Sequence, residues 1–152
     1  MLQRPQTLYL LGVFILSFLL LTGPLALFNL DGGEYLLKHS GLVNSVGEKQ
    51  ALATWPLSVI FALVTLLSFL NIFLYRHRVL QMRICIYLIL IGLGMIGLIF
   101  YYIWVAGNQL DGASVLHKWR IVLPPIIAIL LYLAFRRIRR DELLVKAYDR
   151  IR

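Results

Sequence analysis

The chain of 152 residues is poor in charge and in cysteine. Charged residues make up 14% of it, whereas a soluble domain usually carries about a quarter. The one cysteine, Cys85, excludes an internal disulfide and the paired-cysteine chemistry of membrane disulfide oxidoreductases. We expect it to be a small apolar residue in a helix. The 61% of residues that are hydrophobic form long runs, which predicts that a lipid bilayer surrounds most of the chain.

These runs have no ionisable residue near their centres, where proton and ion pathways commonly place one. The polar residues at depth carry only hydroxyl or amide groups, which more often join helices than bind a transported solute. They are Ser17, Thr22, Ser58, Thr65, Ser68 and Asn71.

Chemical motifs are also missing. The chain offers no catalytic Ser/His/Asp or Cys/His arrangement and no glycine-rich phosphate loop, and its histidines lack the spacing of metal ligands. We therefore predict no enzyme, with no catalytic residue, cofactor or metal. An enzyme or a weak metal site on the outer surface stays open as an alternative. It would need outer-loop groups to cluster: Glu34, His39, Glu48, Asp111 and His117.

Four apolar runs predict four membrane spans, because a helix of about 20 residues crosses a hydrocarbon core of roughly 30 Å. The spans cover residues 8–28, 56–75, 84–106 and 115–135. The first is longer than the apolar region of a cleaved signal peptide, which is about 7 to 15 residues, and Gly23 and Pro24 are expected to loosen its outer end. The predicted fold is all-α, with residues 1–152 forming one integral membrane domain, a four-helix transmembrane bundle.

The fourth run is strictly apolar only from Ile121 to Phe135. Fifteen residues rise about 22 Å in a helix, which is too short, so we predict that this helix starts near Val115. Lys118 and Arg120 would then extend their charged ends to the interface.

Positive charge predicts the orientation. With the N-terminus in the cytoplasm, the inner segments hold eleven of the fifteen basic residues and three acidic ones, while the outer segments hold four of each. The positive-inside rule then places both termini in the cytoplasm. Tryptophan prefers the membrane interface, and Trp55, Trp104 and Trp119 all fall at the predicted outer ends of spans as interfacial anchors.

Two further features are expected outside the lipid or between the helices. Residues 29–54 form an outer loop whose short apolar stretches are separated by Gly, Asn and Ser, which suits a small hairpin or cap. The second outer segment, near residues 107–114, is expected to be only a turn. In span three, Gly92, Gly94 and Gly97 are expected to allow close approach by a neighbouring helix.

The inner side carries two basic segments. One is the turn "YRHRVLQMR", with Arg76, Arg78 and Arg83, which orientation alone explains. The other is the tail, residues 136–152, predicted to continue span four as an amphipathic helix. The tail either anchors on the anionic inner leaflet, where each basic residue contributes about 1 kcal/mol, or docks a membrane-protein partner. Nucleic acid is not expected, because acidic residues interleave and no aromatic stacking pattern is present. The expected partner or lipid contacts are Arg137, Arg140, Leu144, Tyr148 and Ile151.

Four segments carry a family resemblance: "LQRPQTLYLL", "ATWPLSVI", "LYRHRVLQMRI" and "RRIRRDELLVKAYDRIR". The chain resembles, over essentially its whole length, the small four-span inner-membrane proteins of Bacteroidota classed only as a domain of unknown function. Pro5 departs from the aliphatic residue expected there. The resemblance implies a four-helix inner-membrane protein and implies no activity, cofactor or catalytic residue.

Two functions follow as expectations. The first is a non-enzymatic accessory or scaffold component of an inner-membrane assembly, because catalytic groups are absent, the loops are short and the tail has two distinct faces. The alternative is a small transporter or a lipid- or small-molecule-binding protein, which predicts an internal pocket lined by Thr65, Ser68 and Asn71. The oligomeric state is left open.

Overall fold

The structure is a computed structural model, and it describes residues 5–30, 33–44, 49–50, 52–74, 77–110 and 114–149. Within these residues the chain forms four α-helices, one short 3-10 helix and five strands. The helices are α1 (Pro5–Leu21), α2 (Trp55–Phe73), α3 (Arg78–Gln109), η2 (Trp119–Val122) and α4 (Leu123–Asp149). The strands are β1 (Ala26–Leu30), β2 (Gly33–Lys38), β3 (Gly41–Asn44), β4 (Lys49–Gln50) and β5 (Ser114–His117).

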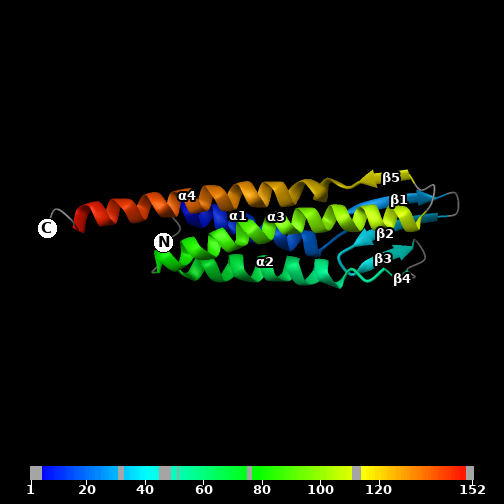
Figure 1. Cartoon of the computed structure of the whole chain (residues 1–152), viewed down its shortest axis with the longest axis horizontal. Coiled ribbons are helices and arrows are strands. Elements are labelled where there is room, and N and C mark those ends of the chain that lie inside the picture. Colours follow the sequence, from blue (N-terminus) through cyan, green and yellow to red (C-terminus); the bar gives the residue numbers. More distant parts are fainter. Residues whose placement is uncertain are drawn as a thin grey trace.

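The α-helices lie alongside one another, and each successive pair in the chain is antiparallel (Figure 1). Helix α1 packs against α2 and α4, and α3 packs against the same two helices from the other side. Burial explains the arrangement, because buried residues recur every three or four positions, as at Leu88, Gly92 and Met95 of α3. Large apolar side chains such as Leu90 and Phe100 stay exposed between them, which is typical of a lipid-facing surface.

Three helical segments are long and apolar enough to cross a membrane: Trp55–Phe73, Arg78–Gln109 and Trp119–Leu144. The first helix is apolar but has only 17 residues, which corresponds to about 26 Å. It ends at Leu21, so the prediction that the first span continues to Phe28 is wrong. Pro24 disfavours a helical conformation at Gly23, and Gly23 lies directly against the guanidinium group of Arg120.

The sheet corrects the all-α prediction. Its five strands are antiparallel in the order β4-β3-β2-β1-β5. The outer loop supplies β2, β3 and β4, while β1 follows directly from the end of α1. The fifth strand comes from the segment between α3 and α4, and it pairs Val115 with Phe28 and His117 with Ala26.

This pairing also overturns the prediction that the fourth helix starts near Val115. Ser114–His117 is extended, η2 follows it, and α4 begins at Leu123. The adjacent prolines explain the start of α4, since Pro124 and Pro125 fall in its first turn, where a missing N–H removes no helical hydrogen bond.

The sheet packs against the C-terminal end of α3, where Phe28 of β1 approaches Gly107 (Figure 1). Ala26, Phe28, Leu37 and Leu42 are fully buried, and the register places them on one face. The Phe28 ring lies 3.9 Å from the position that a Cβ on Gly107 would occupy. The core therefore continues from the helices into the sheet.

The turn between β2 and β3 is joined to the start of α2. The hydroxyl groups of Thr54 and Ser58 each donate a hydrogen bond of 2.8 Å to the carbonyl oxygen of His39. Gly41 follows in this turn with φ +142°, a backbone conformation that favours glycine. We call this end of the molecule the sheet end.

Candidate functional site: a groove between α3 and α4

The opposite end of the molecule, where α3 begins, is here called the basic end. Helix α4 continues there beyond the other helices (Figure 1). It runs without interruption to Asp149, so the described part of the predicted tail is helical, and residues 150–152 lie outside the described residues. Toward this end, α4 carries large exposed apolar side chains, Leu143 and Leu144.

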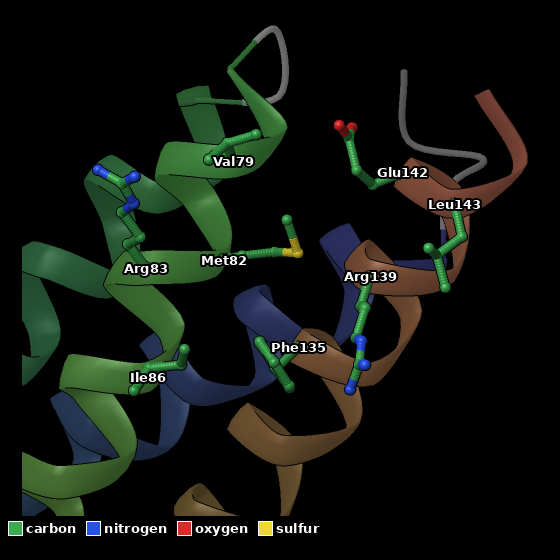
Figure 2. Close-up of a pocket in the computed structure, with 8 residues that line it drawn as sticks. All are labelled: Val79, Met82, Arg83, Ile86, Phe135, Arg139, Glu142 and Leu143. Carbon is green, nitrogen blue, oxygen red and sulfur yellow. The ribbon is translucent and has the colours of Figure 1, made fainter. Parts of the chain in front are cut away.

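A groove of about 330 Å³ lies between the start of α3 and this part of α4. Both walls use same-face spacing of three or four residues, so one side of each helix faces the groove. Met82 and Phe135 extend from opposite walls into the space between the helices (Figure 2). The lining is Val79, Met82, Arg83 and Ile86 from α3, and Phe135, Arg139, Glu142 and Leu143 from α4.

The lining combines apolar walls with three charged side chains. Figure 2 shows the Glu142 carboxylate extending toward the start of α3, while the guanidinium groups of Arg83 and Arg139 point away from each other. None of the eight lining residues is a Ser, Cys or His. The groove therefore suits hydrophobic contact and charge recognition rather than nucleophilic catalysis or metal binding.

A second, smaller pocket of about 210 Å³ lies between α1 and α4 at the same end, and we call it the arginine pocket. It brings the predicted contacts Arg137 and Arg140 together, and its full lining is Tyr9, Leu133, Arg136, Arg137 and Arg140. The other predicted contacts are not part of it. Leu144 is exposed and lines neither pocket, Ile151 lies outside the described residues, and so does the side chain of Tyr148.

The prediction for the arginines of the turn before α3 is partly corrected. Helix α3 starts at Arg78, six residues before the predicted Ile84, because the intervening residues contain no glycine or proline to stop a helix. Arg78 donates from Nη1 to the carbonyl oxygen of Asp141 at 3.4 Å, which connects α3 to α4. Arg83 lines the groove, and Arg76 lies outside the described residues.

Most groove residues were not predicted from the sequence. The spacing of Val79, Met82 and Ile86 is a usable signal, but only once the segment before Ile84 is known to be helical. Phe135 ends the predicted fourth span, where an aromatic residue is expected on lipid grounds alone. Which helix faces which could not be inferred from either pattern.

A buried polar cluster near the basic end fastens α2 to α3. Asn71 donates from Nδ2 to Sγ of Cys85 at 3.2 Å, and Gln81 donates from Nε2 to the carbonyl oxygen of Asn71 at 3.1 Å. Asn71 thus joins two helices, as predicted. Ser17 and Thr65 instead bond to carbonyl oxygens of their own helices, a common alternative for hydroxyl side chains.

The glycines of α3 make no tight contact at the position of a Cβ. A Cβ placed on Gly92, Gly94 or Gly97 meets no atom within 4 Å among the described residues, although Gly92 itself is buried. Their role in helix packing stays a prediction. A close approach occurs at Gly12 of α1, where a Cβ would lie 3.3 Å from Leu130 of α4. A lone glycine gave no periodic signal in the sequence.

At the sheet end, Trp55, Trp104 and Trp119 are all more than half exposed and lie where their helices meet the sheet. Their role as membrane anchors stays a prediction. The outer groups proposed for a metal are spread over the sheet: Glu34 pairs with Asn29, while His117 pairs with Ala26 at the other end of β1. In the described part of the chain, no three His, Cys, Asp or Glu side chains are grouped to hold a metal ion; Glu48 and Asp111 lie outside it.

The surroundings of His39, in the turn between β2 and β3, shift the pKa of its side chain. Burial lowers the pKa of its imidazole from the ordinary value of 6.5, and the neighbouring charge of Lys38 lowers it further. Its Nδ1 is buried without a hydrogen-bond partner in the described structure. The neutral ring is therefore the form that suits the folded turn.

The three residues expected to line an internal pocket do not share one. Thr65 lines an open apolar groove of about 460 Å³ between α1 and α2, together with Phe14, Phe69 and their neighbours. Ser68 and Asn71 are fully buried and do not line this groove.

The comparisons with known proteins give a family and no activity. The family model described as "Domain of unknown function (DUF4293)" matches residues 2–151. No curated protein and no solved structure matches the chain. Because the match covers nearly the whole sequence, the chain belongs to this family.

Proposed function

We propose that this member of the DUF4293 family is a non-enzymatic, multi-pass membrane protein that serves as an accessory or scaffold component of an inner-membrane assembly. In this proposal four helices span the membrane, both termini are cytoplasmic, and the family is the four-span Bacteroidota family described above. The groove between α3 and α4 is its surface for a membrane-protein partner.

The observation that carries this proposal is an exposed apolar side chain of α4 at the wall of the groove. Leu143 and Leu144 are 58% and 57% exposed, and Leu143 adjoins the groove that Met82 and Phe135 fill only in part. Apolar side chains flanked by charged ones at helical spacing are typical of helix-in-groove recognition. A partner helix seated in the groove would cover Leu143, whereas Leu144 lies outside the groove.

The orientation is supported by the distribution of charge over the two ends. Arg78, Arg83 and the arginines of α4 gather at the basic end, while the tryptophans gather near the sheet. From Arg83 to Trp104, α3 rises about 31 Å, which matches a hydrocarbon core of roughly 30 Å. The basic end then lies at the cytoplasmic headgroups.

Two neighbouring leucines provide a matched test. We expect Leu143→Glu to lower recovery of the partner at least about tenfold, since a buried unpaired charge at an interface costs several kcal/mol. Leu144→Glu adds the same charge to an equally exposed position outside the groove and should leave recovery unchanged. The measurement is purification in a gentle detergent, with an N-terminal tag, followed by quantitative mass spectrometry.

The same two variants can also contradict the proposal. If both variants, or neither, lose the same stoichiometric partner, the groove is not the partner surface. A homogeneous protein without a protein partner but with a bound lipid or small molecule would favour the second candidate function, a lipid- or small-molecule-binding protein or transporter.

A separate observation supports this second candidate function. The groove between α1 and α2 is almost wholly apolar, and the rings of Phe14 and Phe69 meet there at 5.4 Å between centroids. A groove of this kind along lipid-facing helices suits an acyl chain or another apolar molecule.

A further inference from the structure

We infer that the arginine pocket between α1 and α4 binds the phosphate group of one anionic phospholipid of the cytoplasmic leaflet. The inference rests on the proposed orientation of the chain, and it adds a lipid site that is separate from the proposed partner groove. The pocket is lined by Tyr9, Leu133, Arg136, Arg137 and Arg140.

Charge is the first argument. Three of the five lining residues are arginines from adjoining turns of α4, and none is acidic. Like charges three or four residues apart destabilise a helix, so a bound anion would relieve a repulsion that the fold itself creates. Among the described residues no ion pair neutralises these arginines.

The depth of the pocket is the second argument. From Trp119 to Arg136 the chain rises about 28 Å, taking roughly 2.0 Å per residue in η2 and 1.5 Å in α4. This distance is close to the roughly 30 Å of a hydrocarbon core. If Trp119 lies at the outer interface, Arg136 lies at the inner headgroups, where lipid phosphates are found.

The lining also suits the rest of a phospholipid. Guanidinium groups recognise phosphate oxygens by paired, charge-assisted hydrogen bonds, and the phenol of Tyr9 offers a further donor. Leu133 lies one turn nearer the membrane centre than Arg136 and Arg137, so it can contact the start of an acyl chain. A volume of about 210 Å³ is below the roughly 300 Å³ of small drug pockets, which suits a phosphate with part of its glycerol.

The groove between α3 and α4 is the weaker phosphate site. Its two guanidinium groups point apart, and a carboxylate lies at the same opening (Figure 2). This difference supplies a closely matched pair of variants. Arg139 lines the groove, whereas the next residue, Arg140, lines the arginine pocket. Both side chains are exposed, so neither substitution removes buried packing.

The test is native mass spectrometry of the full-length protein in neutral detergent with equimolar phosphatidylglycerol and phosphatidylcholine. We expect the unmodified protein to retain one phosphatidylglycerol in preference to phosphatidylcholine. Arg140→Gln should weaken this retention roughly tenfold, the effect of losing a charge-assisted hydrogen bond. Arg139→Gln, with the same change in net charge, should retain it. Tyr9→Phe should weaken retention less than Arg140→Gln.

Three outcomes would overturn the inference. Equal losses in Arg139→Gln and Arg140→Gln would show diffuse attraction to net charge. Equal retention of both lipids would show that the pocket does not select an anionic headgroup over a zwitterionic one, since both carry the same phosphate. Release of the lipid by millimolar inorganic phosphate would assign the pocket to a free phosphate. The partner assay with Leu143→Glu is independent of these readings, so either proposal can fail without the other.

Discussion

The two ends of the molecule are built in different ways. At the sheet end, five strands, a glycine turn and two hydroxyl donors enclose fully buried side chains such as Phe28 and Leu42. At the basic end, α4 continues past its neighbours and leaves two pockets lined by long charged side chains. The contrast indicates that the sheet end is built mainly of buried core, whereas the basic end leaves pockets and charged side chains open.

The largest effect is expected from labelling the two ends in intact cells. A cysteine introduced by Glu34→Cys should react with a membrane-impermeant maleimide added outside, while one introduced by His77→Cys should react only after lysis. Both positions are exposed and Cys85 is buried, so background labelling should be low. The reverse pattern would overturn the orientation deduced from positive charge.

A stability comparison should separate the ends next. Phe28→Ala removes a fully buried ring between the sheet and α3 and should cost about 3–5 kcal/mol of unfolding free energy. Leu143→Ala changes an exposed side chain and should cost within about 0.5 kcal/mol. Denaturant unfolding in detergent micelles measures both. Equal losses would mean that the basic end contributes to the stability of the fold as much as the sheet end does.

The smallest effect should appear in the pH dependence of the sheet end. Because the pKa of His39 is lowered in the folded protein, the unfolded state binds more protons between that pKa and 6.5. Stability is therefore fully present above pH 6.5 and falls as pH decreases toward the folded pKa. Thermal unfolding between pH 7.5 and pH 5 should show this decline in the unmodified protein. In His39→Gln the decline should be smaller, because the group that titrates is absent. An unchanged slope in His39→Gln would assign the decline to other groups.

Much of the helical architecture could be predicted from the sequence because its signals are local. Long apolar runs predict helices wherever they occur, so α2 and α3 were located, although the boundaries of α3 shifted at both ends. The helical continuation after Phe135 was likewise expected from the spacing of charged and apolar residues. Local capping chemistry explains the remaining boundaries, as with Pro24 after α1 and Pro124 at the start of α4.

The candidate sites were harder to predict because they are formed by residues distant in sequence. Arg137 and Arg140 were selected from the tail, but their pocket also requires Tyr9 from α1. Arg83 and Arg139 share a groove only because α3 and α4 are neighbours. In span three, the glycine pattern suggested a close helix contact, but a Cβ on any of these glycines would meet no atom within 4 Å among the described residues.

The sequence by itself determined that this is a chain of apolar helices with one strongly basic end, because helix formation and charge distribution depend on residues close together in the chain. Only the tertiary structure decided that β5 pairs with β1 and that pockets flank α4. Strand pairing and helix neighbours depend on contacts across nearly the whole chain, and local patterns leave such contacts open.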